Sequence, residues 1–183
     1  MHTPLTVAGD GIIWAVGWAK NEDGPRLVVA DNVVRRFDSS GKMLASFVAH
    51  GRTRNADPDA TAASYLMASR DRVGWLTNGC EYIEFSLDGT ELGRFDGPAG
   101  LKIGQIEGAA LSDENDLVVG KFGGGGFDIL ALDRRARAWV SVTLPKETIR
   151  GWSSVLGFDG TTLVATPRSG QLRRFNRGDP SVR

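Results

Sequence analysis

The sequence predicts an all-β protein made of about four four-stranded antiparallel sheets. Similar strand-like runs recur at offsets of 45 to 48 residues along the chain. No window of ten or more residues shows the 3.6-residue apolar period of an amphipathic helix, so we expect little helix. Turn dipeptides that tolerate the positive φ angles of tight hairpins separate the runs: Asp10-Gly11, Asn78-Gly79, Asp88-Gly89 and Asp159-Gly160.

The repeat is clearest between residues 33–44 and 82–92, where Gly41 aligns with Gly89 and Leu44 with Leu92. Residues 127–133 and 171–176 continue the series. Because one four-stranded sheet cannot bury both of its faces, such sheets stack around an axis as the blades of a β-propeller. A β-sandwich is the alternative architecture, although a sandwich does not require this period.

The repeat divides the chain into one propeller-like domain, 1–183, with four blades. We expect these at 4–48, 62–95, 107–143 and 152–183. The expected strands, from the axis outward, are 4–8, 11–18, 26–37 and 42–48; 62–69, 72–78, 81–87 and 91–95; 107–112, 117–122, 127–132 and 137–143; then 152–158, 162–166 and 171–175. Only Pro180-Ser181-Val182-Arg183 remains for the last outer strand. We therefore expect an incomplete ring or part of a larger propeller, with a complete four-bladed ring as the alternative.

The connections sort onto two ends of the sheets. In an antiparallel meander, the turns after the first and third strands share one end, and here they are short. The connections after the second and fourth strands share the other end and are longer: 19–25, 48–61, 96–106, 123–126 and 144–151. Variable connections on a rigid scaffold usually carry binding residues, so the sequence predicts one loop-rich binding face.

The chain resembles the NHL and YVTN-type propellers. The resemblance rests on Leu27-Val28-Val29-Ala30-Asp31 followed by Val34-Arg35-Arg36-Phe37-Asp38-Ser39-Ser40-Gly41, and on Phe85-Ser86-Leu87-Asp88-Gly89. The resemblance is one of architecture and not of sequence identity. The Gly-His and Trp-Asp signature of WD40 repeats is absent, and the segment 86–90 has the composition of a sialidase Asp box with the wrong spacing.

The composition limits the kinds of partner that the chain is expected to bind. The 22 basic and 22 acidic residues balance, which argues against binding of nucleic acid or of an anionic membrane through a broad positively charged surface. Cys80 is the only cysteine, so no internal disulfide forms. We see neither a signal peptide nor an 18-residue apolar run, and expect a cytoplasmic protein if the chain is full length.

Six residues are candidates for ligand binding. His50, Arg52 and Arg54 lie in the longest connection, where arginine can bind a carboxylate or phosphate; a solvated loop is the alternative. Trp18 and Trp152 form an aromatic platform if both face the loop-rich side, whereas buried tryptophans pack between blades. Lys121 precedes four glycines, but in an order that does not match a Walker loop, so a flexible hairpin is the alternative.

These features lead us to expect a non-catalytic propeller that binds a protein, peptide or small polar ligand on its loop-rich face. The alternative is a lactonase-like hydrolase or lyase with a divalent metal near the axis, where Glu107 is one candidate ligand. A third reading is a purely structural segment that closes a larger ring through further blades or by self-association. No cofactor is predicted. Arg35-Arg36 and Arg173-Arg174 recur at one place in the blade, which indicates a structural role.

Overall fold

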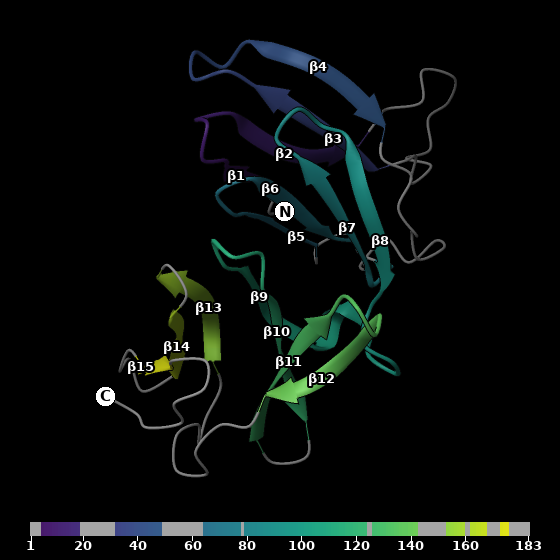
Figure 1. Ribbon diagram of the computed structural model, residues 1–183, viewed down its shortest axis with the longest axis vertical. Helices are drawn as coiled ribbons and strands as arrows, with labels where there is room; N and C mark the ends of the chain where they lie inside the picture. The colour runs from purple at the N-terminus through teal and green to yellow at the C-terminus, as the bar shows by residue number, and fades with distance from the viewer. Residues whose placement is uncertain are drawn as a thin grey trace, which may run out of the picture. The chain divides into compact units, whose positions relative to one another are not determined.

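The computed structural model confirms an all-β architecture. It describes residues 5–18, 32–48, 64–77, 79–123, 126–142, 153–159, 162–167 and 173–175 of the chain. These residues form three four-stranded sheets and one three-stranded sheet, and within each sheet consecutive strands are neighbours (Figure 1). Among the described residues, the helical structure is the single 3-10 turn η2, Ile103–Gln105, and no helix is long and apolar enough to span a membrane.

The strands lie close to the predicted ranges. The first sheet contains β1 Leu5–Val7, β2 Ile13–Trp18, β3 Asn32–Phe37 and β4 Met43–Val48; the second contains β5 Tyr65–Ala68, β6 Arg72–Leu76, β7 Glu81–Ser86 and β8 Glu91–Asp96. The third contains β9 Ile106–Leu111, β10 Leu117–Gly123, β11 Gly126–Asp133 and β12 Ala138–Val142; the fourth contains β13 Ser153–Asp159, β14 Thr162–Pro167 and β15 Arg173–Phe175. Residues 19–31, which include the run at 27–30, and residues 176–183 lie outside the described part of the chain.

The chain divides into two compact units, Met1–Phe95 and Asp96–Arg183. Each unit holds two sheets whose first strands are neighbours, β1 beside β5 in one unit and β9 beside β13 in the other.

The core of the first unit lies between its two sheets. Trp14, Val16 and Val34 of the first sheet pack with an apolar set from the second. That set comprises Leu66, Val73, Trp75, Ile83 and Phe85. The rings of Trp14 and Phe85 lie 6.0 Å apart. Burying a tryptophan of this kind contributes about 4–6 kcal/mol of hydrophobic stabilisation. Separating the two sheets would lose this free energy.

Arg36 adds a polar tie between the same two sheets. It pairs with Trp14 across β3 and β2, and its guanidinium lies 5.1 Å from the centre of the Trp14 ring. Its Nη1 donates a 2.5 Å hydrogen bond to the backbone carbonyl of Asp88, in the β7–β8 turn. Arg36 therefore has a structural contact at the position where the repeat predicted one.

Five turns share one hydrogen-bond pattern. In each, the first residue donates its N–H to the carbonyl of the fifth residue, and the fourth donates to the first. The turns are 8–12, 38–42, 77–81, 86–90 and 112–116. The fourth residue has positive φ, which glycine adopts without strain at Gly11, Gly41 and Gly89.

In two of these turns the fourth residue is not glycine. Between β6 and β7 it is Cys80, with φ 59°, because the turn starts at Thr77. The turn dipeptide Asn78-Gly79 directly precedes Cys80 in the sequence. In the turn at 112–116 the equivalent residue is Asn115, with φ 67°.

Candidate functional site

The structure describes the surroundings of one predicted site residue in full, Lys121. Trp18 ends β2, where its backbone pairs with Asn32. The other four candidates, His50, Arg52, Arg54 and Trp152, lie outside the described residues. Lys121 lies near the end of β10, at the end of the third sheet where the sequence predicts its longer connections.

A β-bulge shapes this end of the third sheet. Gly120 pairs with Gly108, but the next residue of β10, Lys121, pairs with Ile106. Glu107 is therefore the extra residue on β9, and it is half-buried. A bulge breaks the strict alternation of side chains along a strand and is common next to binding sites.

Lys121 also pairs with Asp128 on β11. Its Nζ lies 3.6 Å from Asp128 Oδ2, and the two side chains are 30% and 59% exposed. An ion pair this open to water contributes about 0–1 kcal/mol. Because Asp128 holds it only weakly, the ammonium of Lys121 can exchange this partner for the anionic group of a ligand.

The connection from the second to the third sheet leads into the same end. Its backbone folds on itself, since Gln105 Oε1 accepts a 2.8 Å hydrogen bond from Lys102 N–H, and Gln105 N–H donates to the Lys102 carbonyl at 2.9 Å. Ile103 is buried, and η2 lies beside β10. This anchored turn leaves Lys102 exposed close to the end of the sheet. We call Lys102, Gln105, Glu107, Lys121 and Asp128 the polar end of the third sheet.

The opposite ends of the sheets carry carboxylates that serve their own turns. Asp38 Oδ1 accepts hydrogen bonds from the Ser40 hydroxyl, from Ser40 N–H at 2.9 Å and from Lys42 N–H at 3.0 Å. The Ser40 hydroxyl and then the Lys42 N–H lower the pKa of Asp38. These bonds use the acceptor capacity of the carboxylate inside the turn.

Asp88 plays the same part in the second sheet. It accepts hydrogen bonds from the Ser86 hydroxyl and, at 3.0 Å, from Thr90 N–H, and these two contacts are the main cause of its lowered pKa. Asp10 accepts a 3.0 Å bond from Ile12 N–H in the first sheet. These three aspartates therefore accept hydrogen bonds within their own turns, whereas Asp128 at the polar end of the third sheet forms an exposed ion pair with Lys121.

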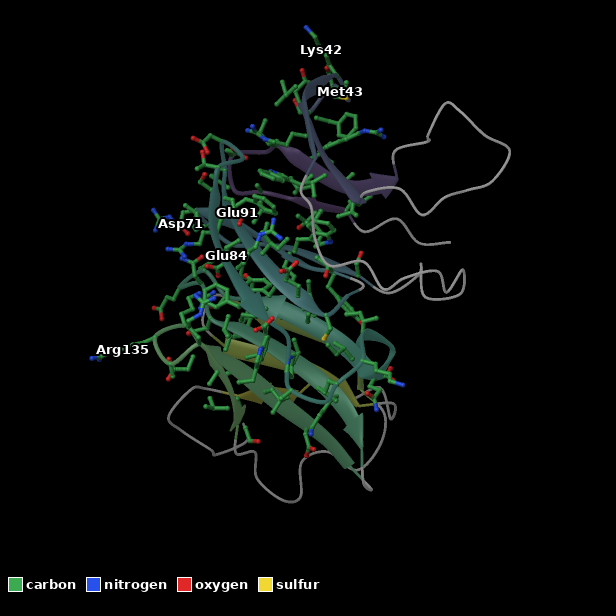
Figure 2. All side chains as sticks on the ribbon, turned by 90° about the vertical axis from the view of Figure 1, so that its right-hand side faces the viewer. Lys42, Met43, Asp71, Glu84, Glu91 and Arg135 are labelled. Carbon is green, nitrogen blue, oxygen red and sulfur yellow. The ribbon has the colours of Figure 1, made fainter. Side chains whose placement is uncertain are left out.

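Sequence reasoning missed several charged residues. Asp128 could have been found, because it and Lys121 lie symmetrically on either side of the glycine run. Two buried glutamates could not. Glu84 pairs with Arg72 at 3.3 Å and Glu81 with Arg94 at 3.3 Å, both within the second sheet. Figure 2 labels Glu84 near Asp71.

No group of three or more His, Cys, Asp or Glu side chains that could hold a metal ion occurs among the described residues. The predicted axial-metal candidate, Glu107, therefore has no established ligand set within that part of the chain. The chemistry of the polar end of the third sheet is that of two ammonium groups, two carboxylates and an amide.

No protein-family model matches the sequence, and no curated protein matches it either. Solved structures do match. The chain is similar to the WD40 repeats of RRP9, with a TM-score of 0.61 and 13% identity over 98% of this chain and 49% of that one. A chain of the mitotic checkpoint complex matches with a TM-score of 0.55 and 11% identity, over 97% and 50% of the two chains.

A third match is virginiamycin B lyase from Staphylococcus aureus, with a TM-score of 0.48 and 15% identity over 96% of this chain and 55% of that one. The chain thus spans about half the length of these three structures. Identities this low show the fold alone. The fold is a partial β-propeller, and the match to WD40 repeats arises without the WD40 sequence signature.

Proposed function

We propose that this chain is part of an NHL- or YVTN-type β-propeller that binds a protein, peptide or small polar ligand at the loop-bearing ends of its sheets. One observation carries the proposal. Among the described residues, Lys121 at the polar end of the third sheet has one ion pair, which is exposed, whereas Asp38 and Asp88 at the opposite ends of their sheets accept hydrogen bonds within their turns. Lys121 therefore offers an anionic ligand a weakly held positive charge at the loop-bearing end of its sheet.

The polar end of the third sheet favours a ligand with an anionic group. Lys121 would bind a carboxylate of the ligand in place of Asp128, and Lys102 would add a second positive charge. Glu107, the extra residue of the β-bulge, would accept a hydrogen bond from an amide or ammonium group of the same ligand. An acidic peptide segment has both kinds of group. His50, Arg52, Arg54, Trp18 and Trp152 remain candidates from the sequence.

A peptide-display selection tests this proposal. Random peptides are selected on the wild-type chain, and the recovered peptides are then measured on two charge-reversal variants, Lys121→Glu and Lys42→Glu. Both lysines are on strand or turn surfaces, but Lys42 lies at a short-turn end. We expect acidic peptides whose affinity falls at least about tenfold with Lys121→Glu, or 1.4 kcal/mol, and is unchanged with Lys42→Glu. Equal losses with both variants would show non-specific charge attraction and refute the site.

A second candidate function, a hydrolase or lyase with an axial divalent metal, is favoured by the position of Glu107 on the first strand of its sheet at a bulge. Calorimetric titration of Ca²⁺ and Mg²⁺ into the wild-type chain and into Glu107→Gln tests it. Stoichiometric binding that Glu107→Gln abolishes would support the enzyme. If the wild-type chain binds neither ion, this candidate is rejected.

A further inference from the structure

The outer strand of the third sheet, β12, has an unprotected edge. It ends the strand order of its sheet and, within the described part of the chain, pairs with β11 alone. Its residues, 138–142, hold an unbroken antiparallel register with β11 and include neither a charged residue nor a proline. Strand edges are usually protected by charge, proline or a bulge, because their outward backbone groups can pair with another chain.

The outer strand of the second sheet shows the usual protection. β8 carries Glu91, Arg94 and Asp96. The Arg94 guanidinium donates to both carboxylate oxygens of Glu91, at 2.8 Å and 2.9 Å. A strand added beside β8 would bury part of this ion pair, and desolvating charges costs free energy. A strand added beside β12 would bury no charge of that strand, so β12 is chemically the more open edge of the two.

β12 is exposed at its centre and anchored on one face. Val140 is 48% exposed and pairs with Ala131 of β11. The indole N–H of the neighbouring Trp139 donates a 2.8 Å hydrogen bond to the backbone carbonyl of Asp96. This bond helps to fix the strand before a partner binds, which lowers the entropic cost of association. An exposed β-branched side chain on a strand edge favours an extended partner with β-branched side chains of its own.

A basic turn leads into this edge. Between β11 and β12 the chain carries Arg134, Arg135 and Arg137 against one carboxylate, Asp133. Asp133 Oδ1 accepts a 2.9 Å hydrogen bond from Ala136 N–H, which gives the turn a defined shape. We call these five residues the basic hairpin. Arg135 and Arg137 are exposed, and Figure 2 shows Arg135 extending away from the sheet. Guanidinium groups bind carboxylates through paired hydrogen bonds, so the hairpin favours an acidic partner.

The basic hairpin differs from the corresponding turns of the first two sheets. The turns 38–42 and 86–90 contain one aspartate each, and the first also contains one lysine. Their positive φ angles fall on Gly41 and Gly89, whereas the hairpin has φ 52° at Arg137. Positive φ costs a residue with a side chain about 1–2 kcal/mol. Backbone strain of this kind is concentrated at functional sites, so it supports a binding role for the hairpin.

We propose that the basic hairpin and the edge of β12 together bind an extended segment of a partner protein, which adds to the third sheet as a fifth strand. The proposal is independent of the function proposed above, whose described residues lie on β9, β10, β11 and the connection before β9. Because β9 to β12 all pair antiparallel, we expect the segment to run antiparallel to β12. Its β-branched residues then lie beside β12, and acidic residues that follow them meet the arginines at the start of the strand.

Fluorescence anisotropy with labelled synthetic peptides tests the proposal on the full chain. The first probe is a short run of alternating threonine and valine residues followed by glutamates, and the second has the glutamates before the run. We expect the first probe to bind at least about fivefold more tightly, because its acidic end alone reaches the arginines in an antiparallel pairing. When it binds, hydrogen–deuterium exchange should slow at residues 138–142 and stay unchanged at 91–96.

Two variants with matched controls assign the contacts. Val140→Lys should weaken binding of the first probe at least about tenfold. Since this change adds positive charge, the loss reports a blocked strand edge. Its control is Leu92→Lys on β8, where the leucine is 49% exposed. Arg135→Glu should weaken binding about fivefold, and less at about 0.5 M salt. Its control is the exposed Lys42, as Lys42→Glu. Lys121→Glu should leave binding of this probe unchanged, which separates this proposal from the function proposed above.

Four results would count against the proposal. If neither probe slows exchange at 138–142, it is overturned. Equal losses in a variant and its control would show non-specific binding and overturn it as well. Equal affinity for both probes would refute the antiparallel placement of the acidic end. Self-association of the wild type that Val140→Lys abolishes, seen by size-exclusion chromatography with light scattering, would assign the edge to a second copy of this chain instead.

Discussion

Gly74→Ala tests how the second sheet is packed. Gly74 lies in the middle of β6, where an added Cβ would meet Tyr82 Oη at 2.3 Å, Cε2 at 2.7 Å and Cζ at 2.9 Å. All three contacts are shorter than real Cβ contacts allow, and Tyr82 is fully buried. The ring cannot move aside without disturbing its neighbours, among them Phe95, whose ring centre lies 6.2 Å from that of Tyr82.

The magnitude follows from two opposing terms. Replacing a strand glycine by alanine gains about 0.5–1 kcal/mol from backbone entropy. Overpacking a core side chain costs about 1–3 kcal/mol, and three short contacts to a rigid ring place this case at the upper end. We therefore expect a net loss of about 2 kcal/mol, which for a chain of this length lowers the midpoint of thermal unfolding by about 4–8 °C.

The assay is thermal unfolding followed by circular dichroism, with Gly157→Ala as the control. Gly157 lies in β13, and an added Cβ there meets no atom of the described residues within 4 Å, so this variant should equal or slightly exceed the wild type in stability. The double variant Gly74→Ala/Tyr82→Leu should lose less than the sum of its single changes, since removing the ring removes the clash. A neutral or stabilising Gly74→Ala would refute the packing argument.

Three further predictions concern the turns and the tie between the first two sheets. Asp88→Asn should lower stability at neutral pH, and the difference from the wild type should vanish as the pH falls below about 4. The reason is that a carboxyl whose pKa is lowered in the folded state stabilises the fold only while it is charged. Thermal unfolding from pH 7 to pH 3 measures this difference, and a pH-independent difference would contradict the prediction. Arg36→Met should lower the free energy of unfolding in urea by about 1–2 kcal/mol, because the hydrogen bond to Asp88 and the contact with the Trp14 ring are lost. Arg35→Met is the control, and equal losses in both variants would argue against a role of Arg36 in joining the two sheets. Cys80→Gly should stabilise the β6–β7 turn by about 0.5–1 kcal/mol, since glycine adopts positive φ without strain. Destabilisation in the same assay would show that packing of the thiol outweighs the relief of backbone strain.

Much of the fold was predictable because strands and tight turns are local. Alternating apolar residues and turn glycines predicted the strands of the first three sheets to within a few residues over the described part of the chain. Gly11, Gly41 and Gly89 have the positive φ angles that their turns require. Cys80 was missed because a five-residue turn admits a non-glycine residue at its strained position when neighbouring strands impose it.

The candidate site was only partly predictable. Lys121 was singled out for its place beside four glycines, but the bulge that makes Glu107 the extra residue depends on how β9 and β10 pair. Nothing in the local sequence distinguishes a regular register from a bulged one. The weak Lys121–Asp128 pair likewise follows from the register of a hairpin, and its availability to a ligand follows from exposure, which only the folded sheet defines.

The sequence by itself determined the repeat, the strands and the turns, since each depends on residues close together in the chain. Tertiary structure decided how one sheet fits the next. The first sheet has Trp14 and Val34 at positions where the second has Gly74 and Tyr82, so the large aromatic side chain lies on a different strand in each sheet. Such an exchange leaves no mark on local periodicity, because close packing constrains the summed volume of neighbouring side chains and not any one position.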